Sequence, residues 1–399
     1  MKISYLAAAL LLSGTALSAQ ETPATVKVGG FIRNFAHIDT KEMISGTAEL
    51  FSYIPLEEQG ENTTTYHYSA LTSRLWVTAD GYKYGNMTAS SRIEADFYNG
   101  LTGVNGTAVL RLRQAFLNLT WANDEGNTIG SLKAGQAWHP MAADMPDILS
   151  LNAGAPFGPF SRTPLVQWDS PITSNLSLTA AAIWQMQYRT CGPDGASANY
   201  MKYHGIPEIY LALNYKTASS LFRAGYDFLS VTPYNGGNSV NSSLVYLYGQ
   251  YKKGSFVAKA KTTYGQDGSH LNLTGGYAVT GGSSAADFEF TPSTSSSTWV
   301  SLSYGKKWQG VLFAGYIKNF GVGKDITGKY WFCGNSRNNV DSAWRITPNI
   351  FRNIGKFTVG GECELTGVKY GEVQKDGSVA GDLKSVVNTR LQLMLKFTF

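Results

Sequence analysis

Alternation of apolar and polar side chains is the dominant pattern of this chain, and it is clearest in the last ten residues, RLQLMLKFTF. Successive side chains of an extended strand point to opposite faces. Leu393 therefore shares a face with the apolar residues two positions away, whereas Gln392 and Lys396 lie on the other face. This segment is predicted to be a strand with one fully apolar face.

The same period of two recurs along most of the chain, whereas a helical period of 3.6 is almost absent after the first residues. Sixteen strands are predicted, at 26–38, 70–82, 86–98, 108–122, 128–138, 163–170, 174–189, 206–217, 219–231, 242–253, 254–266, 297–308, 309–319, 342–353, 355–370 and 385–399. Short turns alternate with eight long connections, the last of them at 371–384. This alternation is typical of bacterial outer-membrane barrels, in which the turns are periplasmic and the loops external.

The two faces of the predicted strands indicate what surrounds such a barrel. In MTASSRIEADFY, for example, Ile93 and Phe97 oppose Arg92, Glu94 and Asp96. A barrel of sixteen strands is too wide for side chains to fill and encloses water. The apolar faces are therefore expected to contact lipid and the polar faces the lumen. The predicted fold is an all-β, transmembrane antiparallel barrel of about sixteen strands, closed so that every backbone group in the bilayer is paired.

The first residues have the pattern of an export signal. Lys2 precedes a short apolar run, and small residues follow it up to Ala19. This pattern predicts a secretory signal peptide at 1–19, with a buried N-terminal helix as the alternative. The remainder, 20–399, is expected to be a single barrel domain in the cell outer membrane.

Composition and charge exclude several other classes of protein. The formal net charge of +5 is too small to indicate nucleic-acid binding. The three cysteines show no zinc-binding spacing; Cys191 and Cys333 could form a disulfide or remain free thiols. No cofactor or metal ion is expected.

Several segments resemble a known family. VKVGGFIRNFAHID, LTSRLWVTADGYKYGN, and LRLRQAFLNLTW followed by LKAGQAWHPMAADMP are similar to porins of the Bacteroidetes and, more distantly, to the dicarboxylate (DcaP-like) branch. In architecture, essentially the whole mature chain resembles a sixteen-stranded porin. The resemblance implies passive diffusion of small hydrophilic solutes, and the slight excess of Arg and Lys in the predicted pore favours a weak preference for anions. It also implies a homotrimer in contact with lipid and lipopolysaccharide, and a terminal Phe399 read by the barrel-assembly machinery.

One element carries over from the family by position, namely the third external loop, which folds into the barrel and narrows it. Here this loop is 139–162, HPMAADMPDILSLNAGAPFGPFSR, and it is more apolar than the others. A β-bulge is expected near Gln114, because Arg111, Arg113, Asn118 and Thr120 of LRLRQAFLNLT cannot otherwise share one face. The predicted constriction consists of the loop acids and the arginines that would face them: Asp144, Asp147, Arg33, Arg74, Arg92, Arg111 and Arg113.

Further charged residues are expected to line the lumen elsewhere: Glu94, Asp96, Lys259, Lys261, Arg345, Glu362 and Glu364. Water in the lumen explains the pair Glu362 and Glu364 more simply than general acid–base catalysis does. The alternative for the arginines is that they only form ion pairs with Glu94 and Asp96.

Two other classes of function, an enzyme and a surface receptor or adhesin, are alternatives to a porin. No catalytic motif is present, so the chain is not expected to be an enzyme. A surface receptor or adhesin could instead use the long loops 39–69, 267–296 and 320–341, with a closed or narrow barrel. Variable external loops need no binding role, however, so the porin is the preferred prediction.

Overall fold

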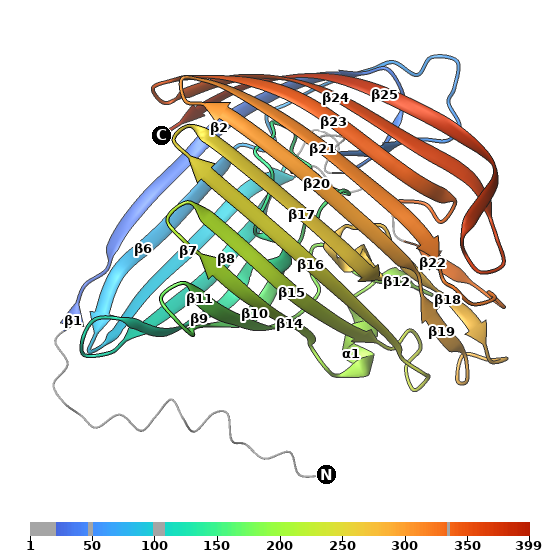
Figure 1. Ribbon diagram of the computed structural model, residues 1–399, viewed down its shortest axis with the longest axis horizontal. Helices are drawn as coiled ribbons and strands as arrows, with labels where there is room; N and C mark the ends of the chain where they lie inside the picture. The colour runs from blue at the N-terminus through green and yellow to red at the C-terminus, as the bar shows by residue number, and fades with distance from the viewer. Residues whose placement is uncertain (1–20, 47–50, 99–107, 333–335) are drawn as a thin grey trace, which may run out of the picture.

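A closed antiparallel β-sheet forms most of the molecule in the computed structural model (Figure 1). The structure describes residues 21–46, 51–98, 108–332 and 336–399, so the predicted signal peptide 1–19 lies outside the described residues. Within them, sixteen strands make up the wall: β2 (Thr25–Asp39), β6 (Arg74–Tyr84), β7 (Met87–Tyr98), β8 (Val109–Ala122), β9 (Thr128–Trp138), β10 (Arg162–Pro171), β11 (Leu176–Ile183), β14 (Glu208–Lys216), β15 (Ser220–Val231), β16 (Val240–Lys253), β17 (Phe256–Gln266), β20 (Thr294–Gly305), β21 (Trp308–Gly321), β23 (Val340–Ile354), β24 (Phe357–Val373) and β25 (Val379–Thr398). Each strand pairs with its neighbour in sequence, and β2 pairs with β25 from Phe31↔Thr398 to Asp39↔Arg390, which closes the barrel.

The predicted strand order is confirmed, with two corrections at strand ends. The predicted strand 174–189 ends at Ile183; beyond it, Gln185 is hydrogen-bonded to Thr190 and Tyr188 packs against the apolar core. The predicted long loop 371–384 is mostly strand: β24 and β25 continue to Val373 and from Val379, and a tight turn joins them. The Gly and Ser residues of this segment occupy the end of an extended hairpin.

The last strand places its apolar side chains on one face and its polar side chains on the other, as predicted from their alternation. Leu391, Leu393 and Leu395 are 58%, 66% and 52% exposed, whereas Arg390 and Gln392 are 1% and 2% exposed. The apolar side chains thus point outward and the polar ones into the barrel. Exposed apolar side chains on this scale exceed what a protein surrounded by water normally shows.

Shorter elements extend the wall or lie in the connections. β1 (Glu21–Thr22) and β5 (Thr65–Ser69) lengthen the edges of β6 and β2. The connections hold β3 (Met43–Gly46), β4 (Phe51–Pro55), β12 (Cys191–Gly192), β13 (Gly195–Ala196), α1 (Asn199–His204), β18 (Gly276–Gly281), β19 (Glu289–Pro292) and β22 (Tyr330–Phe332), together with the 3₁₀ turns η2 (Pro140–Ala142) and η3 (Gly268–Leu271). Figure 1 shows α1, β18, β19 and β22 gathered at one end of the wall. No helix among the described residues is both long and apolar enough to cross a membrane.

The cysteines differ in state. Cys363 is a free thiol, and Cys191 takes part in a disulfide. Cys333 lies outside the described residues.

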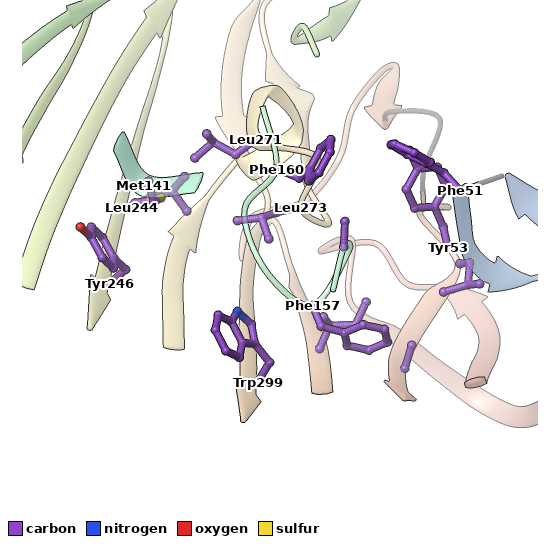
Figure 2. Close-up of a cluster of buried hydrophobic side chains, with 14 of the residues drawn as sticks. Phe51, Tyr53, Met141, Phe157, Phe160, Leu244, Tyr246, Leu271, Leu273 and Trp299 are labelled. Atoms are coloured by element: carbon purple, nitrogen blue, oxygen red, sulfur yellow. The ribbon is translucent and has the colours of Figure 1, made fainter. Parts of the chain in front are cut away.

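The apolar core lies inside the barrel and is built around the connection between β9 and β10. Phe157 and Phe160 of this connection are almost fully buried and pack with Leu271, Leu273 and Trp299 (Figure 2). At the start of the same connection, Met141 lies beside Leu244 and Tyr246. The connection therefore packs into the barrel as an inward-folded loop, as the sequence predicts.

Candidate functional site: the interior of the barrel beside the inward loop

The inward loop, residues 139–162, leaves the wall and returns to it at nearly the same place. The backbone N–H of His139 donates to the carbonyl of Ser161 at 3.0 Å, which joins the two ends of the loop. The loop between them has no regular structure except η2, so its backbone groups must find partners on the wall. The charged side chains of the wall supply these partners.

One side of the loop is fastened by β23 and β24. Arg345 is fully buried and donates to the carbonyls of Ala155, Ser52 and Tyr53 at 3.0, 3.1 and 2.6 Å. Glu362 accepts the backbone N–H groups of Leu149 and Ser150 at 3.0 and 3.1 Å. These wall residues therefore hold both the loop and β4.

Glu364 lies two residues after Glu362 in β24 and also helps to hold the loop and β4. Its carboxylate accepts from the hydroxyl of Ser52 and the amide of Asn152, and it lies 3.4 Å from Arg345 Nη2. The expectation that water wets Glu362 and Glu364 is wrong, since the two are 5% and 0% exposed beneath the loop. They point inward as predicted, but Glu362 accepts backbone N–H groups of the loop, and Glu364 binds the side chains of Ser52, Asn152 and Arg345.

The two predicted lysines fasten the loop from β17. Lys261 is 2% exposed and donates to the carbonyls of Met141 and Asp144 at 2.6 and 3.1 Å. Lys259 donates to the carbonyl of Met145 at 3.2 Å and pairs with Asp147 at 2.6 Å. Asp144 forms an ion pair with Arg223 of β15 at 3.2 Å.

These pairs correct the predicted geometry of the constriction. Asp144 and Asp147 do not face the arginine cluster of β2 and β6–β8; they point toward β15 and β17, where Arg223 and Lys259 neutralise them. The loop presents mainly apolar side chains to the arginines, namely Met145, Ile148, Leu149 and Leu151. The throat thus has a basic wall opposite an apolar wall.

The five predicted arginines lie together on the inner face of β2, β6, β7 and β8, around Glu94 and Asp96. Arg74, Arg92 and Arg113 contact Glu94 at 3.3, 2.6 and 2.8 Å. Arg111 and Arg113 contact Asp96 at 2.9 and 2.7 Å. The alternative that these arginines form ion pairs is thus also realised, but four arginines share two carboxylates.

The predicted bulge is what brings Arg111 and Arg113 to this face together with the polar residues that follow them. Glu94 pairs with Gln114 and the next residue, Ala95, pairs with Leu112, so Arg113 is the extra residue. Such a bulge changes the face of the side chains that follow it.

Two further arginines add charge that no carboxylate neutralises among the described residues. Arg33 donates to the hydroxyl and carbonyl of Thr72 and lies over the Phe31 and Phe35 rings. Arg162, at the end of the inward loop, lies over the Trp138 ring at 4.6 Å. Six arginines therefore surround two carboxylates, which makes this wall strongly electropositive.

Three cavities follow one another inside the barrel along this wall. The first, of about 340 Å³, lies toward the end of the barrel that carries the long connections and is lined by Arg111, Arg162 and Gln187. The second, of about 220 Å³, lies between the loop and Arg33, Arg74, Arg111 and Arg113. The third, of about 500 Å³, includes Trp138, Lys133 and Lys216 and extends toward the short turns. Arg111 lines the first two cavities and Trp138 the last two, so neighbouring cavities meet at these side chains.

Sequence reasoning missed Arg162 and Arg223. Arg162 was counted as the last residue of the loop, and the sequence offered no partner for it. Arg223 alternates with outward residues of β15 in LFRAGYDF, and this period could have placed it inside.

Among the comparisons with known proteins, the superposition on solved structures supports the fold, whereas the sequence comparisons found no match. No family model and no curated protein matches the chain. The outer membrane channel DcaP of Acinetobacter baumannii superposes with a TM-score of 0.69 at 16% identity, over 94% of this chain and 98% of that one.

Two other solved porins share the fold. An anion-selective porin from Comamonas acidovorans gives a TM-score of 0.58 at 11% identity, over 94% of this chain and 100% of that one. OmpF of Salmonella typhi, in complex with daunomycin, gives 0.53 at 11%, over 95% and 100%. The chain therefore has the fold of sixteen-stranded outer-membrane porins, as the sequence resemblance implied. The affinity to Bacteroidetes porins stays a prediction.

Proposed function

We propose that the protein is an outer-membrane porin through which small hydrophilic solutes diffuse passively, with a preference for anions. The observation that carries the proposal is the row of cavities beside six arginines and only two carboxylates, inside a barrel whose outer face is apolar. A charged row in a throat of low dielectric biases which ions enter. The superposition with an outer membrane channel and an anion-selective porin supports the same reading.

The mechanism follows from the two walls of the second cavity. An anion that enters meets guanidinium groups already held in place by Glu94 and Asp96, so little reorganisation is needed to bind it. The opposite wall, formed mainly by the apolar side chains of Met145, Ile148 and Leu151, offers it few hydrogen bonds. Because several arginines lie along the path, the anion can pass from one to the next without being trapped at a single site.

Reversal potentials in a salt gradient test the proposal. Planar bilayers containing the protein should show open conductance steps, and the wild type should select anions. Replacing Arg74, Arg92 and Arg111 together with Ser removes three of the six positive charges around Glu94 and Asp96, so the reversal potential should shift toward cations. Ionic strength near 0.1 M keeps the Debye length at about 10 Å, which preserves the effect.

A matched control removes the same charge at another place. Lys306, Lys307 and Lys356 are exposed in the turns after β20 and β23, and their triple replacement by Ser should leave selectivity unchanged. Asp144→Asn with Asp147→Asn should shift selectivity toward anions, because it frees Arg223 and Lys259. A barrel that stays electrically silent would contradict the porin proposal and favour a surface receptor. Selectivity that responds equally to both triple replacements would contradict the role of the arginines.

We also infer, with the same family resemblance as support, an outer-membrane location reached by secretion, and a homotrimer. One solved structure with this fold, OmpT of Vibrio cholerae, is described as a trimer form. Contact with lipopolysaccharide and recognition of Phe399 by the barrel-assembly machinery belong to the same inference. Chemical cross-linking of the membrane-extracted protein should give a species of three chains.

A further inference from the structure

A second group of ionisable side chains is buried behind the root of the inward loop, and the proposed transport function does not use it. It consists of His139 at the end of β9, Glu208 at the start of β14, Asp227 in β15 and His270 in η3. All four are at most 2% exposed. Asp267, which is fully buried, lies three residues before His270 and adds a third carboxylate to the group.

The hydrogen bonds of His139 fix the position of its proton. Its Nδ1 accepts the backbone N–H of Met141 at 3.1 Å, so this nitrogen must carry a lone pair. The proton of the neutral ring is then on Nε2, which donates to Glu208 Oε1 at 2.6 Å. His139 therefore orients Glu208 and supplies no positive charge in this arrangement.

His270 has the opposite arrangement. Its Nδ1 lies 3.1 Å from the backbone carbonyl of Asp267, which can only accept, so Nδ1 carries the proton. Its Nε2 has no hydrogen-bond partner among the described residues and lies close to two carboxylates, 3.4 Å from Asp227 Oδ1 and 3.6 Å from Glu208 Oε1. Metal-binding histidines commonly donate their second ring N–H to a carbonyl in this way.

Three carboxylate oxygens near Nε2 also lack hydrogen-bond partners. Both oxygens of Asp227, and Oε2 of Glu208, are buried without a hydrogen bond to any described residue. The ion pairs that Glu208 and Asp227 form are with His139 and His270. Buried carboxylates are costly unless paired or bound to a metal, and even a doubly protonated His270 gives one positive charge against three carboxylates.

We propose that His270 Nε2, Asp227 and Glu208 bind one divalent transition-metal ion of the Zn²⁺ type, and that His139 is a positioning residue for Glu208. Ligands about 2.0–2.2 Å from a tetrahedral zinc lie roughly 3.3–3.5 Å apart, which matches the spacings of 3.4 and 3.6 Å. One ligand atom each of His139, Glu208 and Asp227 lies within 4.8 Å of the other two, so the two proposed carboxylate ligands and the positioning residue form one compact group. An imidazole with carboxylates suits zinc better than calcium, which takes six to eight oxygen ligands.

The ion would lie where three segments meet. His139 is hydrogen-bonded to Ser161 across the root of the loop, and the N–H of Phe160 donates to the carbonyl of Leu271, the residue after His270. Glu208 and Asp227 belong to the wall. A bound ion thus ties the loop root and η3 to β14 and β15, and it departs from the expectation from sequence that the chain binds no metal.

Metal content and zinc titration test the proposal on the full chain purified in detergent. After treatment with a chelator and dialysis, the wild type should take up one equivalent of Zn²⁺ per chain. His270→Ala and Asp227→Asn should lose at least tenfold in affinity, and His139→Ala should lose 10- to 100-fold, as for other groups that orient metal ligands. His204→Ala is the matched control, because His204 lies in α1 and is bonded to Ser239 instead.

The readout must separate binding from folding. Heat-modifiable migration in gels reports an intact barrel, and Co²⁺ in place of Zn²⁺ should give visible d–d absorption that His270→Ala abolishes. Should His270→Ala fail to fold, Glu208→Gln is nearly isosteric and tests the same ligand set. Absence of zinc uptake by folded wild type, or full uptake by folded His270→Ala, would overturn the proposal and leave a shared proton between the carboxylates.

Discussion

A single residue in this barrel is defined by the face on which it lies. Leu117 and Asn118 are neighbours in the middle of β8, yet Leu117 is 44% exposed on the outer face and Asn118 donates to Thr120 on the inner face. The bulge at Arg113 sets this parity. Outer-face substitutions are therefore expected to act on stability, and inner-face substitutions on transport.

Arginine at these two positions should separate the faces. Leu117→Arg should destabilise the inserted barrel by about 2–4 kcal/mol if the residue lies near the bilayer midplane, whereas Asn118→Arg enters the water-filled interior and should change stability little. Unfolding by urea in lipid vesicles measures both. Equal losses of stability for the two variants would show that the assigned parity is wrong.

The residues that could be predicted are those whose role is set by alternation. Arg74, Arg92, Arg111 and Arg113 were placed together because they alternate with apolar residues in neighbouring strands. The partners of Asp144 and Asp147 were not predictable, since an irregular loop has no period from which a direction can be read. The cluster around His270 was missed for a related reason: Glu208 and Asp227 lie on the paired strands β14 and β15, but His139 and His270 reach them from irregular connections that have no period.

At the scale of elements, the inward loop depends on charged side chains of the wall that act as hydrogen-bond partners for its backbone. Arg345 alone serves three carbonyls, one of them in the loop itself, and is close to Glu364. The sequence identified the loop by its position and its apolar character. It could not show that the loop covers Arg345 and Glu364. Charged side chains on the inner face of a barrel are expected both where water fills the lumen and where a loop packs over them, so the sequence does not distinguish the two cases.

Removing Arg345 should therefore loosen the loop. Arg345→Met leaves Glu364 as an unpaired buried charge, which typically costs about 3–5 kcal/mol. We expect a lower urea midpoint, faster proteolysis within 139–162 and noisier single-channel currents. Arg352→Met is the control on the same strand, since Arg352 lies over the Trp308 ring and does not contact the loop. Unchanged protease resistance of Arg345→Met would contradict its role as an anchor.

At the scale of the whole molecule, the barrel is closed by the chain's two ends. Gly30 and Phe399 exchange backbone hydrogen bonds, with Phe399 N–H donating to Gly30 at 3.0 Å. A Cβ on Gly30 would lie 2.5 Å from the Phe399 ring and 2.7 Å from the carbonyl of Arg74. The absence of a side chain at Gly30 is thus required where β25, β2 and β6 meet.

Valine at this position should hinder closure, because the ring can move away but the Arg74 carbonyl belongs to the wall. We expect Gly30→Val to cost on the order of 3 kcal/mol, the upper end for overpacked sites, and to reduce the heat-modifiable fraction after refolding. Gly310→Val is the matched control, since a Cβ at Gly310 in β21 meets nothing within 4 Å. Both variants place the same β-branched residue in a strand. A difference between their refolded fractions therefore reports the contact between β2 and β25 at Gly30, and not the strand propensity of valine. If both refold equally well, the contact between Gly30 and Phe399 does not limit closure of the barrel.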